Sequence, residues 1–452
     1  MINTLFLPEL REMLAEQNSQ ALAEFCTALH PSRTAEFMAG LESEEIWQVF
    51  GNTDPDTQVD ILSYFSRPKQ VELVNNHDRE NAAAIVQMLP PDERVDLLQE
   101  VESEVREELI ALMPAEIRLN VLRLQQYPED TAGSVMTTDV TKLPEHLTIK
   151  QAMNEIARQA EDRETIYYLY IVDQEDHLRG LVSARQLLAG MGKPDTPLSE
   201  IMQTDLVAVH VMDDQEEVAN KVARMDLLAI PVVDLERRMV GIITHDDIID
   251  VVREEATEDA HRSAAVEPLD QSYLLTSVLT LSWKRGIWLT ILFFCALLTA
   301  FALKQYEQRL DQIAWLVLFI PLIISSGGNS GSQSATLIIT ALSRGHISVG
   351  DWARVVIREL WMGLLLGFGL ALMGLAASWL LITDASWQMI MVVPVTLVLV
   401  TVTGTLTGSI LPLVFEKIGW DPAIMSNPFV AGIVDILGIV IYMSVAWWLV
   451  GA

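Results

Sequence analysis

The stretch Ala229-Ile-Pro-Val-Val-Asp234, followed by Met239-Val-Gly-Ile-Ile-Thr244, is the most informative part of the middle of this chain. Two short apolar runs bounded by polar residues are typical of buried strands. The same order occurs earlier, where Tyr168-Leu-Tyr-Ile-Val-Asp173 precedes Leu178-Arg-Gly-Leu-Val-Ser183. Because a helical pattern also precedes each strand pair, near 149–160 and 214–225, the sequence predicts two similar α/β modules in tandem.

These strings resemble tandem CBS domains, which usually bind adenosine nucleotides in the cleft between the two copies. In the family motif Gly-x-x-Ser/Thr-x-x-Asp, the hydroxyl contacts phosphate and the Asp contacts the ribose hydroxyls. Gly241, Thr244 and Asp247 match this motif. The resemblance therefore implies a nucleotide site, for a ligand such as ATP, at these three residues.

The first copy departs from the motif. It has Gly180 and Ser183 but carries Gln186 where the motif has Asp. The two modules are expected at residues 130–195 and 196–252. A dimerisation module without nucleotide is the alternative interpretation, since an acidic cleft repels phosphate unless a cation bridges the two.

Residues 40–120 contain an internal repeat. Seven segments rich in acids and Pro, from Leu41-Glu-Ser-Glu to Met113-Pro-Ala-Glu, begin 12 residues apart. Ser, Asp and Pro at such positions favour helix starts, and a short apolar pattern follows each one. The spacing predicts an acidic α-solenoid over residues 1–129, with a plain helical bundle as the alternative.

Charge divides the chain into two parts. Residues 1–282 carry a net charge of −31, whereas residues 283–452 contain 8 basic and 8 acidic side chains. An acidic part of this size argues against nucleic-acid binding. Only two cysteines, Cys26 and Cys295, argue against a disulfide scaffold, and residues 1–30 lack the pattern of a secretion signal.

The second part is predicted to be a transmembrane domain, residues 283–452, with five helices. Each apolar stretch is long enough to cross a bilayer. Six Lys and Arg residues fall on one side of these stretches, and only Lys304 and Arg309 fall on the other. This asymmetry predicts a cytoplasmic N-terminus and an outside C-terminus. The stretches are 286–303, 313–341, 357–382, 388–414 and 428–450.

Two features of the apolar part suggest function. The polar run Ser325–Ser334 is expected to break the second helix, because irregular backbone at membrane depth is tolerated where it packs in protein or lines water. Close helix packing through small residues is the alternative. Asp435 is the only residue in the fifth stretch that is ordinarily charged at neutral pH, and a charge inside the membrane is a functional candidate by default.

An acidic helical stretch, Asp246–Asp259, joins the α/β modules to the membrane part. Its carboxylates at helical spacing are either a solvated face or ligands for hard divalent cations. A connecting helix over residues 253–282 is predicted here.

The whole order resembles the MgtE family of magnesium channels and transporters. The most specific strings are Gly327–Gln333, Asp421-Pro422-Ala423, Asn427-Pro428-Phe429 and Val434–Gly438. The resemblance implies a multidomain fold, with an all-α superhelical N-terminal domain, an α/β tandem CBS pair, an α-helical connecting (plug) helix and a five-helix transmembrane domain. It also implies a homodimer with a central pore in the lipid bilayer of the bacterial inner membrane.

The activity that the resemblance implies is Mg²⁺ entry, closed by cytosolic Mg²⁺, with other divalent cations such as Co²⁺ as further substrates. Asp435 of two subunits would give a local charge of −2 facing a largely hydrated Mg²⁺. The pore-lining residues it implies are Gly328, Asn329 and Asn427. The metal-binding residues it implies are Asp92, Asp96, Glu216, Asp226, Asp247, Asp250, Glu255, Glu258, Asp259, Asp421 and Asp435.

Two other functions compete with a gated channel. A proton-coupled divalent cation transporter would use Asp435 as a titrating group, although five helices do not divide into two equal repeats. A membrane regulator that senses nucleotides would transport nothing. The sequence contains no P-loop and no His-x-x-x-His zinc pattern, so we expect neither ATP-driven pumping nor an enzyme.

Overall fold

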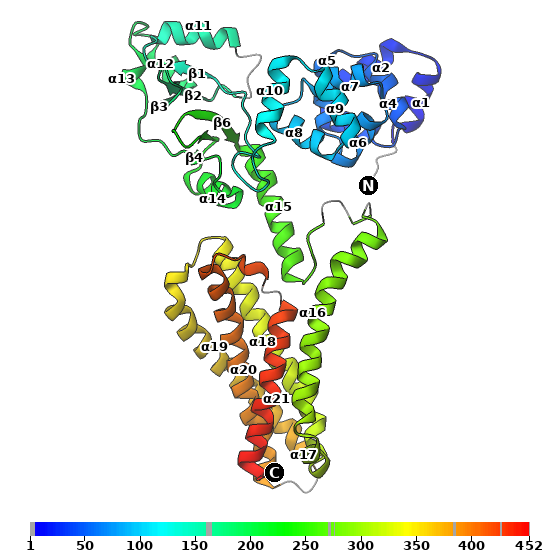
Figure 1. The fold of residues 1–452 in the computed structure, drawn as a ribbon, viewed down its shortest axis with the longest axis vertical. Helices are drawn as coiled ribbons and strands as arrows, with labels where there is room; N and C mark the ends of the chain where they lie inside the picture. The colour runs from blue at the N-terminus through cyan, green and yellow to red at the C-terminus, as the bar shows by residue number, and fades with distance from the viewer. Residues whose placement is uncertain are drawn as a thin grey trace. The chain divides into compact units, whose positions relative to one another are not determined.

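The computed structural model describes residues 5–159, 165–269, 273–274, 276–382, 386–424 and 427–451. The chain divides into two compact units, Met1–Val252 and Arg253–Ala452. The first unit holds a helical repeat and two α/β modules, and the second holds the long apolar helices (Figure 1).

Between residues 5 and 124, the first unit is a stack of ten short helices. Alternate helices pack on one another, so that α5 contacts α3 and α7 while α8 contacts α6 and α10. This arrangement is the predicted superhelix. The helices are α1 Leu7–Ala15, α2 Ser19–Ala28, α3 Pro31–Met38, α4 Ser43–Phe50, α5 Pro55–Ser63, α6 Arg67–Asn75, α7 Arg79–Val86, α8 Pro91–Glu100, α9 Ser103–Leu112 and α10 Ala115–Leu124.

The 12-residue spacing has a direct structural cause. N-cap residues recur every 12 positions, and the Asn18, Asp54 and Asp78 side chains each accept a hydrogen bond from the backbone N–H three residues on. The repeat begins at Asn18, two repeats earlier than its first predicted segment. Its core is a buried residue every 12 positions, each at most 4% exposed. These are Val49, Ile61, Leu73, Ile85, Leu97, Leu109 and Val121.

The two α/β modules follow the predicted order. Each has a three-stranded sheet in which the first strand pairs in parallel with the second and the second pairs antiparallel with the third. The first module contains β1 Lys142–Pro144, α11 Ile149–Gln159, β2 Tyr168–Val172, β3 Leu178–Ser183 and α12 Ala184–Gly190. The second contains α13 Leu198–Ile201, β4 Val209–His210, α14 Gln215–Met225, β5 Ala229–Val233 and β6 Met239–Thr244.

Helix α15, His245–Ser263, follows β6 directly and is the predicted acidic helix. It begins earlier than the predicted connecting helix and ends at Ser263, whereas α16 begins at Val278, so residues 253–282 do not form one helix. The stop has a local cause. Ala265 has a left-handed φ of 57°, and the Val266 N–H donates to the His261 carbonyl, which closes the helix end.

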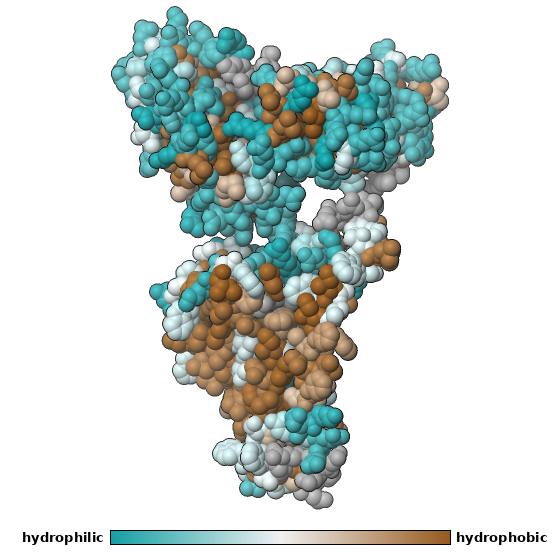
Figure 2. Space-filling view, viewed as in Figure 1, coloured by the Kyte–Doolittle hydropathy of each residue, from teal (hydrophilic) through white to brown (hydrophobic). Residues whose placement is uncertain are grey.

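The second unit is a bundle of long helices. Helix α18 lies against α20 and α21, α19 packs along α20, and α16 contacts α21. Apolar side chains cover the middle of this unit, and hydrophilic ones gather at its ends (Figure 2). The helices are α16 Val278–Lys304, α17 Glu307–Gln312, α18 Trp315–Ser343, α19 Trp352–Leu381, α20 Trp387–Lys417 and α21 Asn427–Val450, with single 3₁₀ turns η2 Val349–Asp351 and η3 Pro422–Ile424.

Among the described residues, four helices are long and apolar enough to cross a membrane, namely α16, α19 with η2, α20 and α21. Helix α18 has a similar length, 29 residues, but contains the run of Ser, Gly, Asn and Gln. Its hydroxyl and amide groups explain why composition alone does not mark it as a spanning helix.

Candidate ion pathway and cytosolic acidic sites

The polar run of α18 does not break the helix, and the predicted interruption at Ser325–Ser334 is wrong. Helix α18 is continuous through it. The small residues serve close packing instead, since a Cβ on Gly404 would lie 2.5 Å from the Gly327 carbonyl oxygen. A Cβ on Gly408 would lie 2.1 Å from the carbonyl oxygen of Gly331. Glycine is therefore required where α18 and α20 meet.

Asp435 lies on α21 at its contact with α18. One carboxylate oxygen, Oδ1, is 3.3 Å from where a Cβ of Gly328 would be, so the missing side chain leaves room for the carboxylate. Asp435 is half-buried, and among the described residues it has no hydrogen-bond donor or cationic partner. The structure thus brings together two of the predicted pathway residues, Gly328 and Asp435.

Asn427 is the first residue of α21 and faces the same side of α18. Its side-chain oxygen accepts a hydrogen bond from the Thr336 hydroxyl at 3.0 Å, and its backbone carbonyl accepts one from Ser332 at 3.0 Å. Gly328, Ser332 and Thr336 are four residues apart, so they form one stripe of α18 that faces α21.

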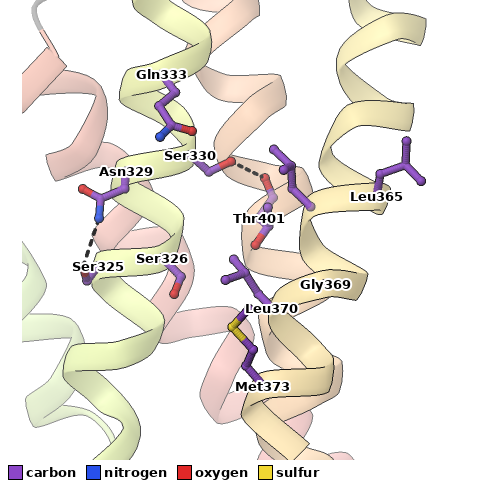
Figure 3. Close-up of a pocket in the computed structure, with 11 residues that line it drawn as sticks. Ser325, Ser326, Asn329, Ser330, Gln333, Leu365, Gly369, Leu370, Met373 and Thr401 are labelled. Atoms are coloured by element: carbon purple, nitrogen blue, oxygen red, sulfur yellow. Dashed lines mark hydrogen bonds between the residues drawn. The ribbon is translucent and has the colours of Figure 1, made fainter.

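Asn329 lies on a different face of α18 from Gly328. It is exposed and donates to the Ser325 hydroxyl at 3.2 Å. Together with Ser326, Ser330 and Gln333 it lines a groove of about 450 Å³ between α18 and α19, as Figure 3 shows. The opposite wall is apolar, and Thr401 of α20 contributes a buried hydroxyl to the lining.

Sequence reasoning missed a second carboxylate in the long helices. Glu359 of α19 is 8% exposed, and its Oε2 accepts a hydrogen bond from the Ser334 hydroxyl at 2.6 Å. The sequence feature that could have revealed it is a single acid that follows seven residues after the start of an apolar helix. It was obscured because Glu359 directly follows Arg358 near the start of the stretch.

A cluster of predicted metal ligands occurs within the second unit. Burial, then the Asp421 and Glu255 carboxylates, raise the pKa of Asp259 to about 6, against the opposing effect of Arg262. The Arg262 guanidinium pairs with Glu258 and with Asp421. The acids of α15 and Asp421, which directly precedes η3, therefore lie close together around one arginine.

In the first unit, the acids of α8 and α15 are near one another. Burial raises the pKa of Asp247 to about 6; the charges of Asp246 and Glu93 add to this effect, while hydrogen bonds from Thr244 oppose it. Glu93 of α8 was not among the predicted ligands, although its neighbours Asp92 and Asp96 were.

The remaining predicted ligands of this unit lie on three helices. Asp96 pairs with Arg67 at 3.6 Å, and Asp250 is exposed on α15. Glu216 is in the first turn of α14, and Asp226 follows the last turn with a left-handed φ of 51°. In the part of the chain that the structure describes, no three His, Cys, Asp or Glu side chains converge where they could hold a metal ion.

The predicted nucleotide residues lie together at the end of β6. Asp247 Oδ2 accepts hydrogen bonds from the Thr244 N–H at 3.1 Å and from its hydroxyl at 2.5 Å. Gly241 packs against residue 137, because a Cβ there would lie 2.5 Å from the Thr137 carbonyl oxygen. This close approach explains the glycine without any ligand.

The first module preserves the same turn despite its different residue. Gln186 Oε1 accepts from the Ser183 N–H at 2.8 Å and from its hydroxyl at 3.0 Å, which completes a capping box. Gln186 therefore retains the structural role of the motif's Asp but not its charge.

Family comparisons agree with this architecture. A model described as a divalent cation transporter, MgtE, matches residues 320–445, and the MgtE intracellular N domain matches residues 29–130. CBS domain models match residues 132–193 and 198–254. The class that the fold and these matches define is a membrane transporter of divalent cations.

Relatives establish the family. The magnesium transporter MgtE of Bacillus subtilis is 30% identical over 97% of this chain and 93% of its own length. The magnesium transporter MgtE of Thermus thermophilus is 40% identical over 72% of this chain and 71% of its own. The chain belongs to the MgtE family, which is a family of transporters rather than of enzymes.

Solved structures resemble the N-terminal half. One match is the soluble part of a magnesium transporter, with 31% identity and a TM-score of 0.52. The matched region covers 55% of this chain and 97% of the transporter fragment. The cytosolic domain of the Mg²⁺ channel MgtE in complex with ATP is 34% identical with a TM-score of 0.51, covering 54% of this chain and 98% of that one.

Proposed function

We propose that this chain forms a homodimeric, Mg²⁺-selective channel that admits Mg²⁺ and is closed by Mg²⁺ bound to its cytosolic acids. The observation that carries the proposal is the half-buried Asp435 carboxylate, held against Gly328 inside a bundle of apolar helices. A carboxylate inside such a bundle carries a large desolvation cost, which makes a functional role, here in an ion pathway, the default expectation. The names of the relatives support Mg²⁺ as the substrate.

Twofold symmetry supplies the charge that a divalent cation needs. In a homodimer, Asp435 would occur once in each subunit, and two carboxylates together carry −2. Mg²⁺ releases its water reluctantly, so we propose that the carboxylates contact its hydration shell. Six of the eight basic residues in the membrane part fall on one side, which supports a cytoplasmic N-terminus and an outside C-terminus in the bacterial inner membrane.

The acidic first part supports closure by Mg²⁺. Two such parts, each with a net charge of −31, repel one another in the dimer until cations neutralise them. Helix α15 carries acids along its length, with Asp247 in its first turn and Glu258 and Asp259 near its end. Carboxylates are the ligands that Mg²⁺ prefers, and several weak sites together would bias the closed state.

Replacing Asp259 by Asn tests this closure. Burial is the main cause of the raised pKa of Asp259, and repulsion from the Asp421 and Glu255 carboxylates adds to it. A bound cation would relieve that repulsion. We expect the cytosolic Mg²⁺ concentration that half-closes the channel to rise about tenfold, measured as current in excised patches. The matched control, Asp56→Asn on the exposed solenoid surface, should leave it unchanged. Equal sensitivity in wild type and Asp259→Asn would contradict the gating role.

We also propose that the second CBS module binds ATP. Thr244 and Asp247 lie together where the CBS motif places phosphate and ribose contacts, and the 34% identical relative was solved with ATP. Asp247→Asn keeps an oxygen that caps Thr244 but removes the charge, so we expect ATP affinity to fall about tenfold by calorimetry. Asp195→Asn, on an exposed loop, is the control. Unchanged affinity in Asp247→Asn would exclude this site.

A further inference from the structure

Glu359 is the other carboxylate that lies more than one turn inside a long apolar helix. It is the eighth residue of α19 and is 8% exposed. Among the described residues it has no cationic partner. A buried carboxylate in a membrane domain carries a large desolvation cost, which makes a functional role the default expectation.

The contacts of Glu359 join three helices. Its Oε2 accepts from Ser334 of α18, itself 4% exposed, at 2.6 Å. Its backbone carbonyl accepts from the Thr405 hydroxyl of α20 at 3.1 Å. One turn later, Gly363 lets α19 approach α20, since a Cβ there would lie 2.5 Å from the Thr405 hydroxyl oxygen.

Ser334 belongs to the same stretch of α18 as the residues that face α21. Gly328 lies six residues before it, which is about 9 Å along a helix. Ser332, between them, donates to the Asn427 carbonyl. Because α18 is one continuous helix through this stretch, a rotation or slide at Ser334 also moves Gly328 relative to Asp435.

We propose that Glu359 is a positioning residue of the ion pathway. By holding Ser334, it fixes the register of α18 so that Gly328 lies against Asp435 and Thr336 against Asn427. This role requires a side chain as long as that of Glu, with a terminal oxygen that accepts the hydrogen bond from Ser334. A Gln side chain also meets this requirement. This inference rests on the proposed function, since it assumes that cations pass Asp435.

Transport by the full-length protein in liposomes gives the first test. We expect Glu359→Leu and Ser334→Ala each to lower the maximal rate of Mg²⁺ uptake about tenfold and to raise the half-saturating Mg²⁺ concentration, because the site is displaced. Glu359→Gln should stay within about threefold of wild type. The variant that carries both Glu359→Leu and Ser334→Ala should transport no more slowly than Glu359→Leu alone, because each single change already breaks the same hydrogen bond between these two residues. Glu307→Leu, exposed on α17, is the control.

A register measurement makes the test independent of transport. In a background without Cys26 and Cys295, cysteines replacing Thr336 and Asn427 should form a disulfide readily, because the two side chains touch. We expect Glu359→Leu to slow this cross-linking about threefold and Glu359→Gln to leave it unchanged. Rapid cross-linking in Glu359→Leu would overturn the inference, and so would a Gln variant as impaired as the Leu variant. A folded wild type without Mg²⁺ uptake would instead contradict the proposed function, and the cross-linking result would still decide this inference.

Discussion

Replacing Asp435 by Asn is expected to lower the rate of Mg²⁺ transport about a hundredfold without unfolding the helices. The amide has almost the same shape, so its packing against Gly328 is kept. The lost term is electrostatic: a pair of unit charges 4 Å apart attracts by about 4 kcal/mol near a protein surface, and a divalent cation doubles this. A hundredfold effect corresponds to about 3 kcal/mol, which this attraction exceeds. Initial uptake rates in liposomes measure it.

The control for this prediction is Glu416→Gln, which neutralises an exposed carboxylate near the end of α20. It should transport at the wild-type rate. Transport by Asp435→Asn within a few-fold of wild type would show that the carboxylate is structural. The proposed pathway past Gly328 would then be wrong.

The second large effect is expected from Gly408→Ala. A methyl group there would lie 2.1 Å from the Gly331 carbonyl oxygen, and backbone atoms cannot move aside as a flexible side chain does. Helices α18 and α20 would have to separate, at a cost of about 3 kcal/mol, the upper part of the usual range for overpacking. Unfolding of the purified protein in detergent, followed by helical content and by the yield of monodisperse protein, measures the loss.

Gly286→Ala in α16 makes the same chemical change where the added methyl group has no atom within 4 Å apart from the neighbouring backbone of its own helix. It should be neutral or slightly stabilising, because Ala favours helix over Gly. Equal stability of Gly408→Ala and Gly286→Ala would mean that α18 and α20 do not pack as closely as described.

The solenoid shows what sequence reasoning predicts well. Its evidence is local and repeated: a cap residue, an acid or Pro, and an apolar pair every 12 positions. Asn18 and His30 were missed as repeat starts because the segments 17–20 and 29–32 contain no acid, although Pro31 follows His30 as in several later segments. The CBS strands were also predictable, since each short apolar run is bounded by polar residues.

The polar run of α18 shows where such reasoning fails. Gly, Ser and Asn are poor helix formers in water, so a break was expected at Gly327–Gln333. Packing overrides this preference. Gly404 and Gly408 of α20, far away in the sequence, have no side chain and let the backbone of α18 pack directly against α20. Nothing in the spacing of either segment alone reveals the pairing.

The acidic residues were predicted less well than the solenoid but better than the packing of α18. Their abundance and the helix α15 were evident, but their partners were not, since charge clusters have no spacing that identifies a contact across elements. The closeness of Glu93 to Asp247, and the pairing of Arg262 with Asp421, required the three-dimensional arrangement. Whether these acids bind Mg²⁺ stays a prediction.

Patch recording from proteoliposomes tests most directly the proposal that this protein is a Mg²⁺ channel closed by cytosolic Mg²⁺. With Mg²⁺ as the permeant cation, we predict unitary currents at nominally zero cytosolic Mg²⁺ that disappear as cytosolic Mg²⁺ reaches millimolar concentrations. Slow uptake that depends on the proton gradient, without unitary currents, would contradict the channel and favour a proton-coupled transporter.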